Sequence, residues 1–397
     1  MSSWFRFGFG LLVFAIAATI LAWATSPDPR GNPASFEDAE LEPGIAPLSD
    51  ARTLASFGDE AGEVVTLLVT GFDGERVSGV DLADLGADRT GNPLLDLASV
   101  AETAITEESV ANLPLLTVDM ADLLPAGPAG ERHIGTGTNF PEHAEEANSS
   151  SVFQFPKFGK ATPARAAIRA EKGILLDYEV ELCMRFDRDI ASLGDFDAAI
   201  KGVFLCGDFT NRNALVELAD PGNLDSGFGF SDAKSGPGAY PSGPFVVVPR
   251  DWESFVDATR MTTSVNGEPR QDARGGEMTL DFRQLVEKAL GDMDEERFLF
   301  AGEMFRLASD HRISNDMTLM SGTSEGTIFT PPSRADYIEG ILAYVLAGGP
   351  FSEAGLVDTV KSRFVSNELA SGHFLQPGDT VRHDSNVLGN IEVQVTD

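Results

Sequence analysis

Three acidic residues lie in two apolar, strand-like segments of the chain. Glu179 and Glu181 are two residues apart in LDYEVELC, and Asp208 follows in VFLCGDF. Alternate side chains of a strand point to the same face, so the two glutamates project together while Val180 and Leu182 face the packed side. Acids that converge repel one another and raise one another's pKa unless a cation neutralises them. They therefore predict a site for Mg²⁺, Mn²⁺ or Ca²⁺, since ligands that are all oxygen select these ions over zinc.

A histidine and a glutamate, His143 and Glu146 in NFPEHAEEA, are the candidates for acid–base chemistry. Because they are three residues apart, they share a face of even one helical turn, and the carboxylate can orient the imidazole. Gly135 and Gly137 precede them, and we expect this segment to close over a substrate. Taken singly, this pair and the Glu-x-Glu pattern are both typical of solvated surface. Their occurrence together in one chain favours a catalytic metal site.

Further motifs follow in order along the chain. They are FQFPKFGKATP, SDAKSGPGAYPSGPFVV, VNGEPRQDARGGEM, SGTSEGT and LQPGDTV. With GTGTNFPEHAEE and LDYEVELC, they resemble the fumarylacetoacetate hydrolase family over about residues 130–397, and a looser match begins near Arg52. Each pattern alone is weak evidence for the family, but their occurrence in the same order is strong evidence. The resemblance implies the α+β class, predominantly β, with a mixed β-roll catalytic domain that carries the metal at its mouth.

The resemblance also implies roles for residues outside the acidic triad. His143 and Glu146 would activate a water, and Lys234 would approach the substrate as a third catalytic residue. Four further residues would bind the substrate. They are Lys157, Arg212, Gly322 and Thr323.

Five positions depart from the family pattern. Phe158 follows Lys157 where relatives carry proline, and Gly207 and Asn213 differ from the segment around the family arginine. Ser324 and Glu325 replace the usual proline and the residue after it. Because an additional acid beside an anion-binding group is unfavourable, we expect this protein to recognise a different end of its substrate.

Composition excludes some classes of partner. The chain has 397 residues, of which 42% are hydrophobic, enough to bury the core of one large domain and a smaller one. Its net charge of -33 argues against nucleic acid, which is bound through Lys and Arg. Cys183 and Cys206, the two cysteines, are too few for a disulfide framework. We expect buried thiols, and a bridge between them is the alternative if the two strands are neighbours.

The N-terminus carries an apolar stretch. Residues 7–27 hold no charge and follow Arg6, so residues 1–25 predict a signal peptide or a membrane anchor. Either would place the catalytic domain outside the cytoplasm, exported or anchored to the inner membrane; a buried helix in a cytoplasmic protein is the alternative. A Pro-rich linker follows at residues 26–50.

The rest of the chain divides into two predicted domains. Residues 51–127 alternate short β runs with turns and predict a small β-rich N-terminal domain. Residues 128–397 form the catalytic domain, with a helical insert near 334–372 where relatives usually have a short connection. The family resemblance also implies a homodimer.

The function implied is metal-dependent hydrolysis of a C–C bond. A 2-oxo acid or β-diketone of the acylpyruvate kind would chelate the ion, which stabilises the enolate. Decarboxylation, hydration or isomerisation of a related 2-oxo acid is the alternative reaction. A different class, an exported ligand-binding or interaction protein on the same scaffold, is the alternative to an enzyme.

Overall fold

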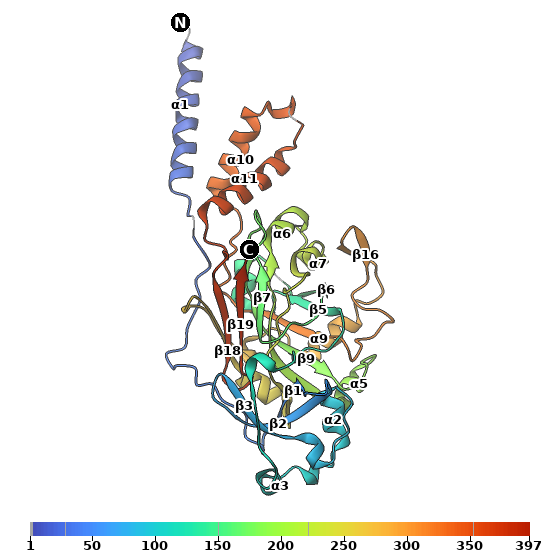
Figure 1. Ribbon diagram of the computed structural model, residues 1–397. Coiled ribbons are helices and arrows are strands. Elements are labelled where there is room, and N and C mark those ends of the chain that lie inside the picture. Colours follow the sequence, from blue (N-terminus) through green and yellow to red (C-terminus); the bar gives the residue numbers. More distant parts are fainter. Residues whose placement is uncertain (1–2, 28, 150, 221, 352) are drawn as a thin grey trace.

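The computed structural model is built around one ten-stranded sheet, in the order β4-β3-β2-β1-β12-β10-β9-β17-β5-β6 (Figure 1). It describes residues 3–27, 29–149, 151–220, 222–351 and 353–397. The strands of this sheet are β1 (Ala51–Gly58), β2 (Val64–Phe72), β3 (Arg76–Asp81), β4 (Leu116–Asp119), β5 (Arg132–Gly137), β6 (Phe153–Phe158), β9 (Val180–Phe186), β10 (Lys201–Gly207), β12 (Val246–Pro249) and β17 (Leu319–Thr323).

A second sheet of five strands packs against the first, in the order β14-β13-β18-β19-β7. It contacts the large sheet through β13 with β9 and through β18 and β19 with β10. Its strands are β7 (Arg165–Arg169), β13 (Arg260–Val265), β14 (Glu268–Arg274), β18 (Thr380–Ser385) and β19 (Asn390–Thr396). Two small pairs complete the strands, β8 (Leu176–Asp177) with β11 (Thr210–Asn211) and β15 (Phe298–Phe300) with β16 (Glu303–Phe305).

Helices are short and lie around the sheets, apart from those at the N-terminus and in the insert. They are α1 (Ser3–Ala24), α2 (Pro93–Ser99), α3 (Glu107–Ala111), α4 (Pro141–Glu146), α5 (Leu193–Ala198), α6 (Arg212–Leu218), α7 (Phe230–Lys234), α8 (Trp252–Ala258), α9 (Phe282–Leu290), α10 (Arg334–Leu346) and α11 (Leu356–Ser371). The predicted class, α+β and predominantly β, is confirmed.

Strands β9 and β10 form the centre of the core. Both consist mainly of apolar residues, and every residue of β9 is buried. They pair antiparallel, with Cys206 opposite Glu181 and Gly207 opposite Val180. Beyond the last strand pair, the Asp208 amide donates to the Glu179 carbonyl at 2.9 Å. The pairing therefore continues to the acidic residues and sets their relative position.

The predicted N-terminal domain shares its sheet with the catalytic segment. Strands β1 to β4 fall within residues 51–127, and β1 pairs antiparallel with β12, so Leu54 lies opposite Val246. The boundary at residue 127 stays a prediction.

The predicted linker, residues 26–50, is held against the catalytic segment. The Asn32 side chain donates to the carbonyls of Thr327 and Phe329, at 3.1 and 2.7 Å. The Glu37 amide donates to Asp272 at 2.8 Å, and Arg274 forms an ion pair with the Glu37 carboxylate. These bonds fix the linker as a strap along the second sheet.

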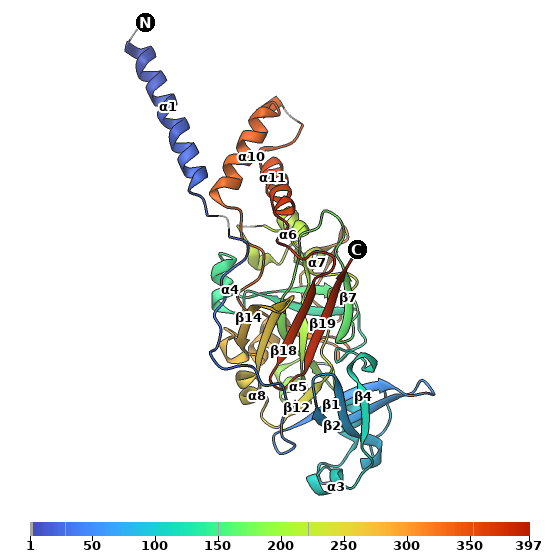
Figure 2. The same cartoon turned by 60° about the vertical axis from the view of Figure 1, so that its left-hand side comes forward.

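Helix α1 lies beside α10, at the end of the molecule that also carries α6 (Figures 1 and 2). Its Trp23 indole donates to Glu339 of α10 at 2.9 Å. Within the described residues, the structure contains no helix with the length and apolarity needed to cross a bilayer. The segment predicted as signal peptide or anchor lies partly outside the described residues, and export and membrane attachment stay predictions.

The helical pattern predicted at residues 334–372 forms a hairpin of two helices, α10 and α11. A capping box at Ser333 and Asp336 begins α10, each side chain bonding to the other residue's backbone amide. The helices cross closely at Gly340, where an added Cβ would lie 2.7 Å from the Val360 Cα. The hairpin rises from the body of the molecule above α6, which α11 contacts (Figure 2).

Candidate functional site

The three acids of the predicted metal site meet at the ends of β9 and β10. Glu179, Glu181 and Asp208 each offer a carboxylate oxygen, and these oxygens lie within 4.8 Å of one another. All three residues are buried, Glu181 and Asp208 completely. Val180 and Leu182 point to the apolar side and pack in the core, as the strand alternation predicts. The structure therefore brings together the three residues that the sequence singled out.

Glu179 is compensated by two positive charges. Its Oε2 accepts from Lys234 Nζ at 2.6 Å, and its Oε1 accepts from Arg212 Nη2 at 2.9 Å. Burial by itself raises the pKa of a carboxyl group, but Lys234 and Arg212 outweigh burial here and lower the pKa of Glu179 to about 2. Glu179 is therefore ionised throughout the physiological range.

Glu181 has the opposite electrostatic environment. Burial and the neighbouring charges of Asp208 and Glu179 raise its pKa well above the ordinary value for glutamate. Its Oε2 accepts from the Gly322 amide at 2.9 Å, whereas its Oε1, although buried, has no hydrogen-bond partner among the described residues.

The orphaned Glu181 oxygen is the feature that fits a metal ion. A buried acceptor without a partner is costly, and a cation among three carboxylates would both satisfy it and relieve their repulsion. The oxygens of Glu179 and Asp208 accept hydrogen bonds, but each carboxylate oxygen has a second lone pair free to bind a cation. An all-oxygen donor set suits a hard divalent ion.

Lys157 and Lys234 hold Asp208 between them. Lys157 Nζ donates to Asp208 Oδ1 at 2.5 Å and to the carbonyls of Lys234 and Ala239, while Lys234 Nζ donates to Asp208 Oδ2 at 2.9 Å. Lys234 also bonds to Thr210 Oγ1 at 3.1 Å. Burial lowers the pKa of Lys157, although Asp208 opposes this effect. These bonds make Lys157 a positioning residue for Asp208, and its predicted contact with substrate stays a prediction.

His143 and Glu146 lie on one turn of α4, as their spacing predicts. His143 Nδ1 is 2.9 Å from Glu146 Oε2. The other carboxylate oxygen of Glu146 accepts from the Gly326 amide at 3.0 Å. With Nδ1–H directed at the carboxylate, Nε2 carries the lone pair and is the atom that can accept a proton.

Gly322 and Thr323 end strand β17 directly beside the triad. Gly322 adopts a positive φ of 82°, which favours glycine, and this conformation accompanies the bond from its amide to Glu181. Thr323 Oγ1 donates to the Val180 carbonyl at 2.9 Å and accepts from Gln271 Nε2 at 2.9 Å. With both bonds formed, Thr323 fixes β17 to β9, and its predicted contact with substrate stays a prediction.

Asp177 is a site residue that the sequence analysis missed. It is fully buried, its Oδ2 accepts from Arg212 Nε at 2.8 Å, and the Ile328 and Phe329 amides donate to its carboxylate. Arg212 therefore bridges Asp177 and Glu179. The alternation Asp177, Glu179, Glu181 was the available signal, since it continues the acidic face by one position.

Glu325 points away from the site that it was expected to perturb. Its carboxylate accepts from the Ser35 amide of the strap at 3.1 Å.

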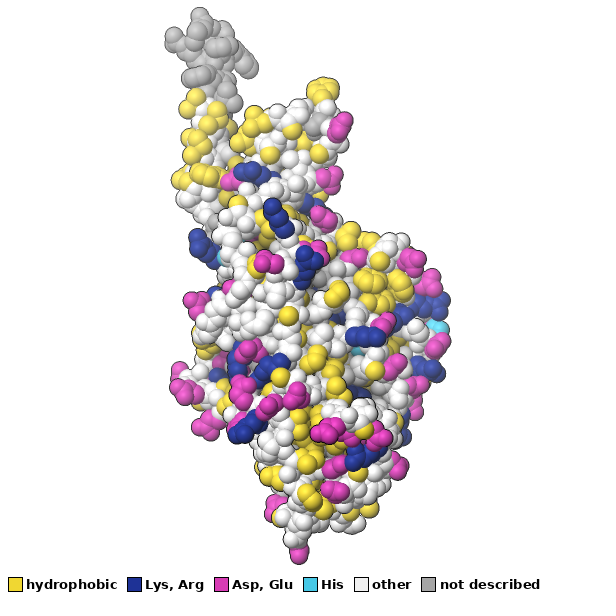
Figure 3. All heavy atoms as spheres, viewed as in Figure 1, with side chains coloured by type: hydrophobic (Ala, Val, Ile, Leu, Met, Phe, Trp, Pro, Cys, Tyr) yellow, Lys and Arg dark blue, Asp and Glu magenta, His cyan; other side chains and the backbone are white. Residues whose placement is uncertain are grey.

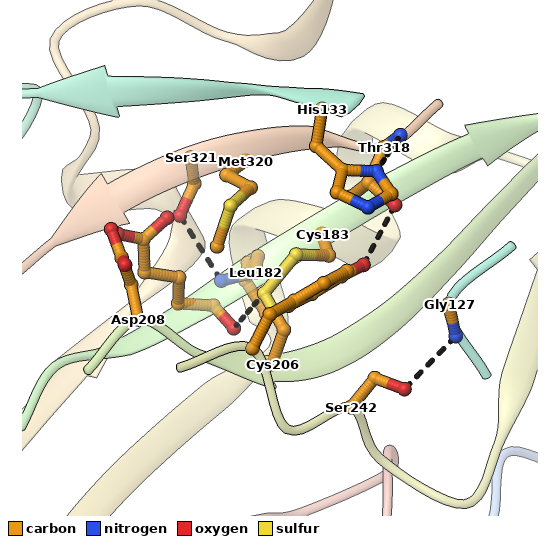
Figure 4. Close-up of a disulfide and its surroundings, with 12 residues drawn as sticks. Gly127, His133, Leu182, Cys183, Cys206, Asp208, Ser242, Thr318, Met320 and Ser321 are labelled. Atoms are coloured by element: carbon orange, nitrogen blue, oxygen red, sulfur yellow. Dashed lines mark hydrogen bonds between the residues drawn. A yellow bond between two sulfur atoms is a disulfide. The ribbon is translucent and has the colours of Figure 1, made fainter. Parts of the chain in front are cut away.

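The cysteines were expected to be buried thiols, and this prediction is wrong. Cys183 and Cys206 form a disulfide between β9 and β10 (Figure 4). The register places Phe204 opposite Cys183 and Glu181 opposite Cys206, so the cysteines are diagonal neighbours with Cα atoms 6.0 Å apart, within bonding reach. The bridge thus joins the two strands that carry Glu181 and lead to Asp208.

A cavity of about 600 Å³ reaches the site. Six of the ten predicted site residues line it. They are His143, Glu146, Glu179, Arg212, Lys234 and Thr323. The other four lie next to these six. Lys157 and Asp208 bond to Lys234, and Glu181 belongs to the triad with Glu179. Gly322 bonds in turn to Glu181.

Comparison with known proteins places this geometry in context. Residues 132–396 match the family described as Fumarylacetoacetate (FAA) hydrolase C-terminal. The chain is 32% identical over 208 residues to an uncharacterized protein of Staphylococcus epidermidis, which covers 50% of this chain and 65% of that protein. It is 30% identical over 174 residues to one of Staphylococcus aureus, covering 42% and 55%. The matched region thus spans less than two thirds of the length of these relatives.

Solved structures share the fold. A 2-hydroxyhepta-2,4-diene-1,7-dioate isomerase from Mycobacterium marinum aligns with a TM-score of 0.50 and 15% identity, covering 87% of this chain and 98% of that one. A Mycobacterium smegmatis protein aligns with a TM-score of 0.51 and 19% identity, covering 87% and 99%.

Proposed function

Because the chain belongs to the fumarylacetoacetate hydrolase family, whose members are enzymes, we propose that it hydrolyses a C–C bond in an acylpyruvate-like 2-oxo acid or β-diketone with a divalent cation. The observation that carries the proposal is the buried triad with the unpartnered Glu181 oxygen, beside a cavity that His143 and Glu146 also line. Mg²⁺ is the proposed ion, and Mn²⁺ or Ca²⁺ would suit the same ligands.

Glu179, Glu181 and Asp208 would hold the cation. When bound, it supplies a Lewis acid that polarises the carbonyl oxygens of a 2-oxo acid and favours the enolate. Two of these acids are kept in place by ion pairs, Asp208 by Lys157 and Glu179 by Arg212. Lys234 lines the cavity and would add a positive charge near the substrate carboxylate.

His143 would act as the general base. Glu146 holds Nδ1–H, so Nε2 can take a proton from a water in the cavity. The water oxygen then attacks the acyl carbonyl carbon, the bond from this carbon to the methylene carbon breaks, and the electron pair passes to the pyruvate enolate. The enolate regains a proton, and the products are a carboxylic acid and pyruvate. Such a base contributes about 10²- to 10⁴-fold to the rate.

The test uses protein stripped of metal by chelation. Acetylpyruvate should lose its enol absorbance and yield equimolar pyruvate only after Mg²⁺, Mn²⁺ or Ca²⁺ is restored, and His143→Ala should slow this turnover by about 10²- to 10⁴-fold. Disappearance of substrate without pyruvate would favour the alternative reactions, which are decarboxylation, hydration and isomerisation. If no cation altered either the melting temperature of the protein or its turnover, the proposal of a metal-dependent enzyme would be refuted.

A further inference from the structure

We infer that the substrate carries a long, uncharged apolar tail that lies against the helical hairpin α10–α11. This inference rests on the proposed function, because it places the 2-oxo acid head at the triad and asks what the rest of the cavity can hold. In this inference the hairpin forms the distal wall of the site.

The cavity is polar at one end and apolar at the other. The polar end holds Glu179, Lys234 and the pair His143 and Glu146. The lining also includes Phe153 and Phe230, whose ring centroids lie 4.6 Å apart, and apolar residues of α6, such as Leu215 and Val216. Such a lining would desolvate an apolar chain without requiring any hydrogen bond from it.

The hairpin supplies the far end of this apolar lining. Ile341 of α10 and Val357 and Val360 of α11 all line the cavity. Ile341 is 48% exposed and Val357 is 65% exposed, so these side chains retain apolar surface that a ligand can cover. Figure 3 shows hydrophobic side chains on the hairpin and on the described part of α1, with charged side chains between those of the hairpin. Exposed apolar surface is typical of interaction and ligand-binding sites, and its continuity with the cavity favours a ligand here.

The volume exceeds what a short 2-oxo acid requires. The cavity of about 600 Å³ falls within the range of about 300–1,000 Å³ that encloses ligands of drug size. Pyruvate itself has six heavy atoms. A short acylpyruvate would therefore leave the hairpin wall uncovered.

The apolar end of the cavity is poorly suited to a second carboxylate on the substrate tail. Arg212 and Lys234 already pair with Asp177, Glu179 and Asp208 at the polar end. Among the described residues of the apolar end, the basic side chain in the lining is Lys361, whose Nζ donates to the Glu217 carbonyl at 2.9 Å. A dioic substrate would place its distal charge against mainly apolar side chains, which is costly.

The experiment compares acylpyruvates whose acyl chains have two, six, eight and ten carbons, using the full chain loaded with Mg²⁺. We expect kcat/KM to rise by about fourfold for each added methylene until the wall is covered. Succinylpyruvate, which ends in a carboxylate, should be a poorer substrate than hexanoylpyruvate. In parallel, calorimetry measures the binding of pyruvate, 2-oxooctanoate and 2-oxododecanoate below their micellar concentrations.

Ile341→Glu and Val357→Glu should flatten the dependence on chain length, because a charge at the wall opposes the tail. Leu342→Glu is the matched control, since Leu342 is 55% exposed on the same helix and lies outside the cavity lining formed by the described residues. Lys361→Met should leave the preference for long chains in place.

The outcomes separate this inference from the proposed function. Turnover that does not depend on chain length would contradict the apolar tail but not the proposed hydrolase. An equal loss of the preference for long chains in Leu342→Glu and Ile341→Glu would do the same. Absence of turnover together with 2-oxo acid binding that tightens with chain length would refute the hydrolase and support the tail. Absence of binding at every length would overturn both.

Discussion

The backbone amide of Gly326 donates a hydrogen bond of 3.0 Å to Glu146 Oε1 and so ties helix α4 to the loop after β17. The same loop leads back to Gly322, whose amide donates to Glu181. The end of β17 and the loop after it thus bond both to the carboxylate beside His143 and to a proposed metal ligand. The pair of His143 and Glu146 and the acidic triad are thereby fixed relative to each other.

Replacement of Glu146 by glutamine should reduce turnover without unfolding the site. Glutamine can still accept from Gly326, but it is neutral and stabilises a protonated His143 less well than a carboxylate does. We expect kcat to fall by about tenfold or more, and His143→Ala to cost about 10²- to 10⁴-fold. Steady-state kinetics measures both. Glu145→Gln, an exposed change on the same helix, is the control, and equal losses in the two glutamine variants would contradict the orienting role.

Replacement of Glu181 by glutamine should separate metal binding from folding. The change keeps the shape of the side chain and removes its charge, which burial and the repulsion by Asp208 and Glu179 disfavour, as the raised pKa of Glu181 reflects. We therefore expect the metal-free variant to melt no lower than the metal-free parent. Addition of Mg²⁺ at 100 times its Kd stabilises the parent by about 2.7 kcal/mol, and the variant should lose most of this shift. If Mg²⁺ stabilised Glu181→Gln as much as the parent, Glu181 would not be a metal ligand.

Loss of the disulfide should destabilise the fold. In the double variant Cys183→Ala, Cys206→Ala, the unfolded chain gains freedom over a separation of 23 residues, and we expect a cost of about 2–4 kcal/mol. Urea denaturation under non-reducing conditions measures this cost. Thiol titration of the unfolded parent should find no free thiol before reduction and two after it. Two thiols before reduction would show that the bridge does not form.

Acid should destabilise the protein through two buried histidines. Burial lowers the pKa of His133 to about 4 and that of His383 to about 3, against an ordinary value of 6.5. Between pH 6.5 and these values the unfolded chain binds protons that the folded chain does not, so stability falls as pH falls. Each histidine contributes about 1.4 kcal/mol per pH unit in its window, and nothing above pH 6.5.

Urea midpoints between pH 8 and 4 would detect this effect. His383→Gln should flatten the pH dependence, whatever its effect on stability at pH 8. His311→Gln, at a histidine whose side chain is 56% exposed, should leave the dependence unchanged. An unaltered slope in His383→Gln would contradict the assignment of a neutral, buried His383.

A bulky residue at Gly340 should move the hairpin. A Cβ there would meet the Val360 backbone at 2.7 Å, and a backbone atom cannot yield as a flexible side chain can. We expect Gly340→Val to separate α10 from α11 and to lower the kcat/KM ratio of decanoylpyruvate to acetylpyruvate. Ala347→Val, at the exposed end of α10, is the control. An unchanged ratio in Gly340→Val would show that the crossing of the helices does not shape the wall.

Local patterns in the sequence were sufficient for much of the candidate site. The alternation of Glu179 and Glu181 follows from strand geometry alone, and the i, i+3 spacing of His143 and Glu146 follows from one helical turn. Both are properties of a few neighbouring residues. Asp177 obeys the same alternation and was missed because its partner Arg212, 35 positions along the chain, meets it only after folding.

What the sequence by itself determined is the acidic face, the acid–base pair and the order of the family's motifs, because each depends on short-range spacing. Tertiary structure decided the disulfide, since only the register of β9 against β10 places Cys183 diagonal to Cys206. It also decided that Lys157 and Lys234 hold Asp208, and that the hairpin lines the cavity. These features depend on segments far apart in the chain, and no local propensity specifies how such segments meet.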